Sequence, residues 1–185
     1  MIQKIVLSLL LIGALSTTAV NAQNTFVSNG ATVSFFSSTP LEDIEGISKN
    51  GLSALDLSTG AILFKVKNTS FQFKKKLMQE HFNENYMESD QFPFSEFKGK
   101  IENPDKLKSD GTYQCMVAGT LTVHGVTKNY TAPVKITVNK GSITAACTFK
   151  VKTADHGIEV PTIVIKNIAE TLDIKVAAIY NAKTR

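Results

Sequence analysis

This 185-residue sequence contains no tryptophan, only two cysteines and five prolines, and no basic run longer than three residues. Its lysines and arginines do not alternate with aromatic residues, which makes nucleic acid a poor candidate partner. It has neither a serine in a nucleophile elbow nor a glycine-rich phosphate loop. No motif therefore supports catalysis, and we predict that the protein is not an enzyme.

The first 22 residues differ in pattern from the rest of the chain. Lys4 precedes an apolar run at residues 5–15, and Val20, Asn21 and Ala22 form a small-residue cleavage site. The run is shorter than the about 20 residues of a membrane-spanning helix, so we predict a signal peptide and no transmembrane span in the mature chain. No cysteine near the site offers a lipid anchor. We expect a periplasmic or secreted protein with one mature domain, residues 23–185.

Alternating apolar and polar side chains dominate the mature chain. Cys115, Val117 and Leu121 would face one side of a strand, and Gln114 and Thr120 the other. Glycine-containing turns at residues 124–128 and 139–141 predict hairpins. The pattern predicts about eight strands, at residues 31–37, 52–57, 61–66, 94–101, 113–123, 130–138, 143–151 and 171–180. These favour an all-β sandwich or a closed barrel, and closure removes exposed edges.

One segment, residues 75–93, has the period of a helix instead. Its polar residues, including Glu80 and Glu84, fall on one face, and we expect the opposite face to lie on an apolar surface. Pro93 predicts the end of the helix. The face expected to be buried consists of Leu77, Met78, His81, Phe82, Asn85 and Tyr86.

The same segment allows a chemical alternative. His81, Glu84 and Glu88 have helical spacing and could ligate a metal, but a solvated acidic face explains them better. We therefore predict no metal and no cofactor. The lysines at 74–76 suit either an anionic head group or, as we expect, a solvated helix start. For His124 and His156, which lie in glycine-containing turns, we expect hydrogen bonding in those turns.

Cys115 and Cys147 are candidates for a disulfide in an exported chain. In a meander, Cys115 would pair near Thr137 and Cys147 near Pro133, which leaves one strand between the thiols. Strands two apart are about 9–10 Å from each other, beyond the reach of a disulfide. We predict two buried, reduced cysteines.

Several motifs together resemble one known family. Residues 119–128, Gly-Thr-Leu-Thr-Val-His-Gly-Val-Thr-Lys, resemble the G-x-L-T-[IV]-H-G-x-T-[KR] signature of YceI-like proteins. Residues 155–158, Asp-His-Gly-Ile, resemble the late D-[FY]-G-[IV] element of that family. Further similarities lie at residues 33–36, 39–43, 68–71, 78–90, 92–93 and 97, so the resemblance covers essentially the whole mature chain.

The resemblance implies an eight-stranded antiparallel lipocalin-like β-barrel with a helical insert. In characterised relatives the interior holds an isoprenoid or another long apolar chain, and the family has no common catalytic activity. We therefore expect an exported carrier or sequestering protein for a long apolar amphiphile such as an isoprenoid lipid. As the ligand-binding residues we predict Phe64, Phe71, Met78, Phe82, Tyr86, Phe97, Leu121, Val134, Phe149 and Ile174.

Two other functions stay open from the sequence. A barrel of eight strands is just wide enough to be filled by side chains or to hold one small ligand. The first alternative is therefore an exported structural or stress-related barrel with a filled core, and the second is a metal-dependent hydrolase. An interior cavity would separate the carrier from the filled barrel. The sequence leaves the oligomeric state open, a homodimer included.

Overall fold

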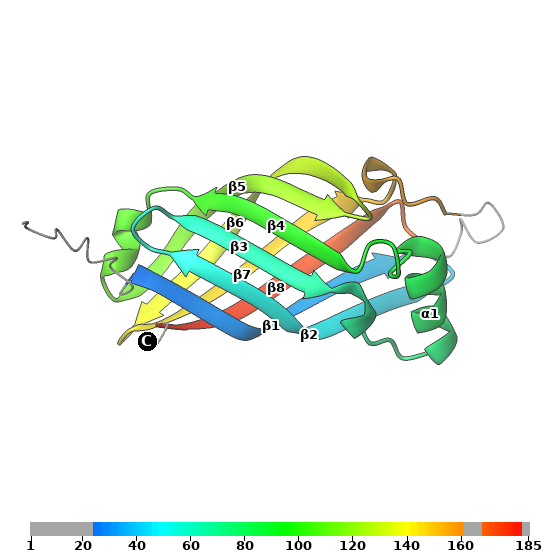
Figure 1. The fold of residues 1–185 in the computed structure, drawn as a ribbon, viewed down its shortest axis with the longest axis horizontal. Coiled ribbons are helices and arrows are strands. Elements are labelled where there is room, and N and C mark those ends of the chain that lie inside the picture. Colours follow the sequence, from blue (N-terminus) through cyan, green and yellow to red (C-terminus); the bar gives the residue numbers. More distant parts are fainter. Residues whose placement is uncertain (1–23, 161–167, 183–185) are drawn as a thin grey trace, which may run out of the picture.

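The computed structural model describes residues 24–160 and 168–182, so the predicted signal peptide lies outside the described residues. Its strands close into an antiparallel barrel in chain order, in which β1 pairs with β8 (Figure 1). This confirms the predicted barrel. The strands are β1 (Thr25–Ser38), β2 (Asp43–Asp56), β3 (Ala61–Lys67), β4 (Phe94–Ile101), β5 (Gly111–Val123), β6 (Val126–Asn139), β7 (Ser142–Lys152) and β8 (Thr171–Ala182).

Two-residue turns join β5 to β6 and β6 to β7. His124 and Gly125 have φ angles of 49° and 71°, and Lys140 and Gly141 have 47° and 80°. Positive φ at both central residues is typical of type I′ hairpins, whose twist matches that of the flanking strands. The two predicted hairpins are therefore confirmed.

The strands β1 and β2 are longer than predicted because a bulge interrupts their alternation. The register between them shifts from Asn29 to Ala31 and again from Ala31 to Val33. Before the shift Phe26 and Ser28 are buried, whereas after it Ala31 and Val33 are. The buried positions thus change from even to odd numbers, so a search for strict period two finds only part of each strand.

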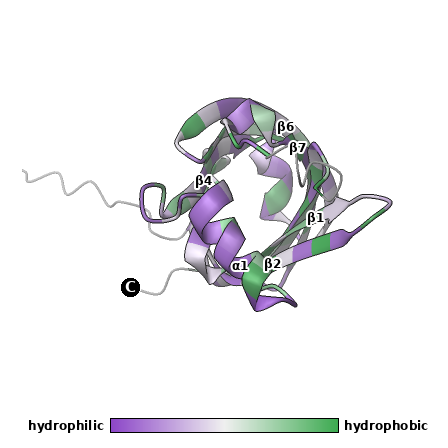
Figure 2. Ribbon diagram, turned by 90° about the vertical axis from the view of Figure 1, so that its right-hand side faces the viewer, coloured by the Kyte–Doolittle hydropathy of each residue, from purple (hydrophilic) through white to green (hydrophobic). Residues whose placement is uncertain are grey.

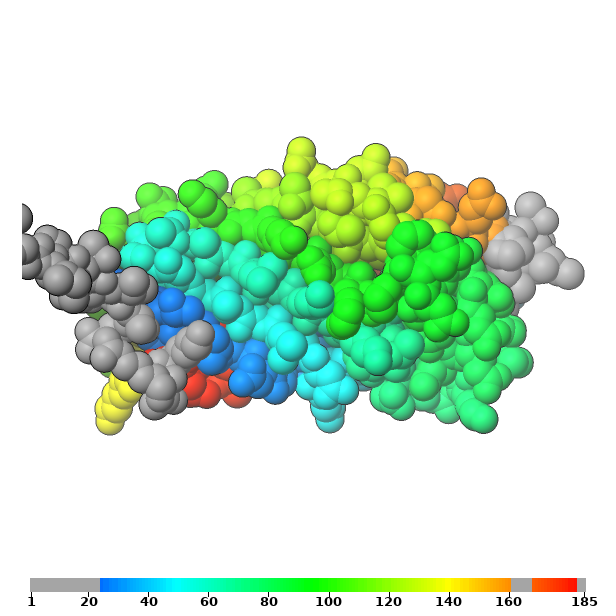
Figure 3. Space-filling view, viewed as in Figure 1, coloured from blue at the N-terminus to red at the C-terminus, as the bar shows by residue number. Residues whose placement is uncertain are grey.

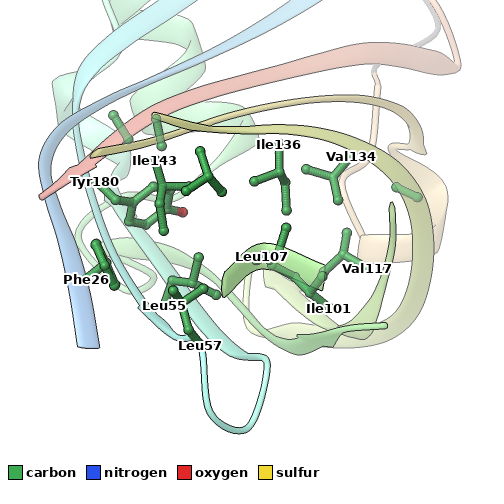
Figure 4. Packing of buried hydrophobic residues seen from close by; sticks show 14 residues of the cluster. Phe26, Leu55, Leu57, Ile101, Leu107, Val117, Val134, Ile136, Ile143 and Tyr180 are labelled. Carbon is green, nitrogen blue, oxygen red and sulfur yellow. The ribbon is translucent and has the colours of Figure 1, made fainter. Parts of the chain in front are cut away.

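One end of the barrel is packed solid. A 3₁₀ turn (Pro104–Lys108) follows β4 and brings Leu107, which is 1% exposed, into the main hydrophobic cluster. Side chains of this cluster converge inside the barrel (Figure 4). Its buried members include Phe26, Leu55, Leu57, Ile101, Leu107, Val117, Val134, Ile136, Ile143 and Tyr180.

A helical insert between β3 and β4 lies at the opposite end of the barrel, where Figure 2 shows α1 beside the rim. It consists of a 3₁₀ turn (Asn68–Ser70), the short helix α1 (Lys76–His81) and a π-helical turn (Phe82–Tyr86). In the described part of the chain, no helix has the length and apolar character needed to cross a membrane.

The insert corrects the predicted helix. The regular α-helix has only six residues, because the chain continues in a π-helical turn that changes which residues lie above one another. Met78, Phe82 and Tyr86 are half-buried as predicted, but Leu77, 60% exposed, and Asn85 face water. The prediction was therefore wrong for Leu77 and Asn85, and His81 is also exposed.

Both cysteines are free, and their predicted register was wrong. Cys115 and Cys147 each pair with Val134, from opposite sides, so β6 still separates them. They are half-buried rather than fully buried. The alternation indicates which face a residue occupies, but the turn of each hairpin decides its partner. The turns at His124–Gly125 and Lys140–Gly141 are both shorter than predicted, which shifts the partner of Cys115 by three residues and that of Cys147 by one.

Gly119 of β5 pairs with Gly99 of β4, and a substitution there tests the close approach of these two strands. A Cβ atom on Gly119 would lie 2.2 Å from the carbonyl oxygen of Lys98. Gly119→Ala should therefore lower the free energy of unfolding by about 2–3 kcal/mol, measured by urea denaturation. Gly30→Ala is the control, because its Cβ would meet nothing nearer than 3.9 Å. Equal stability of the two variants would contradict this account of the contact.

Candidate functional site: an apolar cavity inside the barrel

A cavity of about 370 Å³ occupies the interior of the barrel. At the packed end it is lined by Leu55 and Tyr180, and at the other end by Met78 and Tyr86 of the insert. Strand residues of alternating positions, predominantly apolar, form the wall between these ends. On the face seen in Figure 3, the insert continues the surface of the strands at its end of the barrel.

All ten residues predicted to bind ligand line this cavity. The strands β3 to β8 contribute one each and the insert contributes the other four, because inward positions of different strands meet in a closed barrel. That these residues contact a ligand stays a prediction. The ten are Phe64, Phe71, Met78, Phe82, Tyr86, Phe97, Leu121, Val134, Phe149 and Ile174.

The sequence prediction missed other wall residues. Half of them share strand and parity with a predicted residue, as Ala132 does with Val134 and Cys147 does with Phe149. Extending the alternation along each strand would have found them. Val33 and Phe35 lie at alternating positions of β1 after its bulge, within the predicted strand at residues 31–37, so period two also marks them. Ile158 and Val160 lie in irregular chain, which no period marks.

Four phenylalanines hold the insert against the barrel. Phe82 has its ring centroid 5.4 Å from Phe35 of β1, 5.4 Å from Phe71 and 5.1 Å from Phe73. Such pairs contribute about 0.5–1.5 kcal/mol each beyond simple burial. The neighbouring Gly46 leaves the space that Phe35 needs, because a Cβ there would lie 2.5 Å from its ring. These four phenylalanine side chains thus form part of the cavity wall.

Asn68 fixes the two ends of the insert to each other. Its side chain is fully buried, its Nδ2 donates to the carbonyl oxygen of Phe92 at 2.6 Å, and its Oδ1 accepts from Ser95 at 2.9 Å. Its backbone N–H donates to the carbonyl oxygen of Pro93. The insert therefore leaves and re-enters the barrel at one hydrogen-bonded point, with Asn68 also in the cavity wall.

A polar network lies behind the wall near the insert. The fully buried His156 has Nδ1 3.0 Å from the carbonyl oxygen of Val126, so Nδ1 carries the proton. Its Nε2 then accepts from the hydroxyl of Tyr130, at 3.0 Å. His124 Nδ1 lies 3.3 Å from the His156 carbonyl oxygen. The predicted hydrogen bonding of both histidines is confirmed, although the bonds join different turns.

Four ionisable groups in the wall favour their neutral forms. Burial raises the pKa of the phenols of Tyr86, Tyr130 and Tyr180, and of the Cys147 thiol. All four groups are therefore uncharged at neutral pH. The Lys65 ammonium, which hydrogen-bonds Glu96 at the cavity's edge, is the main cause of the lowered pKa of that carboxyl.

The three residues weighed as metal ligands do not converge. His81 and Glu84 are exposed, and Glu88 lies with Oε2 3.3 Å from Nε2 of His124 instead. Within residues 24–160 and 168–182, no three His, Cys, Asp or Glu side chains cluster as a metal site would require.

The fold and the cavity define the class of this protein: a closed eight-stranded antiparallel barrel with an apolar internal cavity and a helical insert at one end. Residues 19–179 match the family model of the YceI-like domain. The chain belongs to the YceI-like family. A search of curated protein sequences gives no significant match.

Solved structures share the fold at low sequence identity. A polyisoprenoid binding domain from Saccharophagus degradans, implicated in plant cell wall breakdown, has a TM-score of 0.75 at 12% identity, covering 87% of this chain and 99% of its own. BcnA of Burkholderia cenocepacia has 0.68 at 18%, covering 80% and 95%. The Campylobacter jejuni YceI protein has 0.61 at 19%, covering 75% and 85%. At such identities the likeness concerns the fold.

Tyr130→Phe tests the network behind the wall. It removes the donor to His156 Nε2 and leaves a buried acceptor unsatisfied, so the free energy of unfolding should fall by about 1–3 kcal/mol. Urea denaturation measures this fall. In the control, Tyr113→Phe, the lost bond to the carbonyl oxygen of Ser109 is exposed and should cost less. A Tyr130→Phe variant as stable as the control would contradict the assignment.

Proposed function

We propose that this protein is an exported carrier or sequestering protein that binds a long apolar amphiphile, an isoprenoid or similar lipid, inside the barrel without chemical change. The observation that carries the proposal is the apolar cavity of about 370 Å³ that runs from Tyr180 to the helical insert. Each methylene group moved from water into such an environment contributes about 0.8 kcal/mol. A chain of several isoprene units would gain a large driving force from the wall alone.

Two further findings support a lipid as the occupant. The chain belongs to the YceI-like family, and a structural neighbour is described as a polyisoprenoid binding domain. Four neutral ionisable groups in the wall also suit an apolar ligand better than a hydrophilic one. Residues 1–22 have the pattern of a signal peptide, which supports export.

The alternatives have less support. A barrel with a filled core would have no cavity of this size, because natural cores hold few voids larger than a water molecule. A metal-dependent hydrolase would need convergent ligands, and His81, Glu84 and Glu88 point to different surroundings.

Lipid extraction with a blocked variant tests the proposal. Ala145 lies in the cavity wall, whereas its neighbour Ala146 faces outward and is exposed. Organic extraction and mass spectrometry should find a long-chain lipid in the purified protein and in Ala146→Phe. Ala145→Phe fills the cavity and should lose at least about 90% of that lipid while remaining folded by circular dichroism. Equal lipid in both variants, or none in the unaltered protein, would refute binding inside the barrel.

The two thiols give a second test that does not fill the cavity. Both thiols pack against the main core cluster, but Cys147 lines the cavity, whereas Cys115 is not among its lining residues. A bound lipid should slow alkylation of Cys147, measured in Cys115→Ala, and leave Cys115, measured in Cys147→Ala, unaffected. Because burial raises the pKa of both thiols, both rates should rise with pH above the ordinary thiol pKa of about 8.5. Equal protection of both thiols would count against occupancy of this cavity.

A further inference from the structure

The cavity wall offers no lysine or arginine among residues 24–160 and 168–182. Its two carboxylates already have basic partners: Glu42 is 2.8 Å from Lys75, and Glu96 is 2.7 Å from Lys65. A phosphate or carboxylate group drawn into this wall would lose its hydration without gaining a cation in return. Such uncompensated burial is strongly unfavourable.

Most neutral polar groups of the wall are already hydrogen-bonded within the protein. Near the packed end, the hydroxyl of Tyr180 lies 2.8 Å from that of Ser53. Among the described residues, no fully buried side-chain nitrogen or oxygen lacks a partner. The other satisfied groups are Ser37, which accepts from the Ala169 N–H, Asn68, bonded to Phe92 and Ser95, and Tyr130, bonded to His156. Among the described residues, the deep cavity therefore has no nitrogen or oxygen group left to bind a polar ligand end.

Tyr86 differs from these groups. It lies in the cavity wall at the end of the π-helical turn, half-buried, and its hydroxyl has no hydrogen-bond partner among the described residues. Burial raises the pKa of Tyr86, so the phenol keeps its proton at neutral pH. A protonated phenol both donates and accepts one hydrogen bond, which suits an uncharged alcohol, carbonyl or amide.

We propose that the cavity selects long-chain ligands with an uncharged polar end, and that the Tyr86 hydroxyl binds this end where the cavity meets the insert. The inference rests on the proposed function, and it specifies the ligand class. The apolar chain lies along the barrel toward Tyr180, and the polar end stays near Met78 and Tyr86. The same chain with a phosphate or carboxylate end is disfavoured.

Basic groups near the insert do not reverse this preference. Lys74, Lys75 and Lys76 are exposed at the start of α1, and Lys75 and Lys76 are bonded to Glu42 and Glu80. His81 borders the cavity but is exposed to water. Charges in such positions are screened by salt, and their acidic neighbours offset them.

Competition between two matched ligands tests the proposal. The purified protein, after solvent extraction of any co-purified lipid and refolding, is titrated with geranylgeraniol and with geranylgeranyl diphosphate. The alcohol should bind at least about tenfold more tightly at 0.15 M salt, because the diphosphate end gains no compensating lysine or arginine from the described wall residues. Equal or tighter binding of the diphosphate, weakened by added salt, would overturn the proposal and assign the anionic end to the lysines or His81.

The substitution Tyr86→Phe tests the named contact. It should weaken geranylgeraniol binding about three- to tenfold, the value of one hydrogen bond, and leave binding of the hydrocarbon phytane unchanged. Tyr113→Phe, far from the insert, should alter neither. Equal weakening for both ligands would show that Tyr86 only packs, and unchanged alcohol binding would exclude its hydroxyl; both results overturn the proposal.

A different result would indicate that the proposed function itself is wrong. If alcohol, diphosphate and hydrocarbon all fail to bind, and extraction of the unaltered protein yields no lipid, the barrel does not carry a long apolar chain. If all three bind with equal affinity, lipid binding stands and the selection for an uncharged end is refuted.

Discussion

The pairing of β1 with β8 is the constraint on which the rest of this structure depends. It joins residues from opposite ends of the domain, such as Phe26 with Ala182 and Phe36 with Asp173. Once this ladder closes the sheet, every second side chain of each strand points into one enclosed space. The number of strands sets the width of that space, so whatever volume the inward side chains do not fill remains as a cavity.

The two ends of the barrel use this space differently. At one end Leu107, supplied by a 3₁₀ turn, and Tyr180 complete a packed core. At the other, Phe82 anchors the insert through contacts with three phenylalanines, and Asn68 joins its two ends. The insert contributes side chains to the cavity wall and does not fill the interior, so the cavity extends up to the insert. The distribution of polar groups follows the same division, with satisfied groups deep inside and Tyr86 near the insert.

Local pattern predicted much of this arrangement. The alternation of β5 to β8 placed Leu121, Val134, Phe149 and Ile174 in the wall, because period two depends only on the pleat of each strand. The pattern failed where a neighbouring strand intervened. The bulge between β1 and β2 changes which residues face inward, and the tight turn after β6 sets the partner of Cys147. Leu77 was misplaced because the half-buried stripe of the insert is narrower than predicted: Met78, Phe82 and Tyr86 lie on it, whereas the adjacent row with Leu77 faces water.

The amino-acid sequence by itself determined the all-β class, the inward face of most strands, the helical insert and the family, since each depends on short-range periodicity or contiguous motifs. Only the tertiary structure decided the closure of β1 on β8, the register of the strands and the volume left inside. It alone also decided which polar wall groups are satisfied, as Tyr130 is by His156. These properties depend on contacts between residues far apart in the chain, and a local sequence pattern contains no information about such contacts.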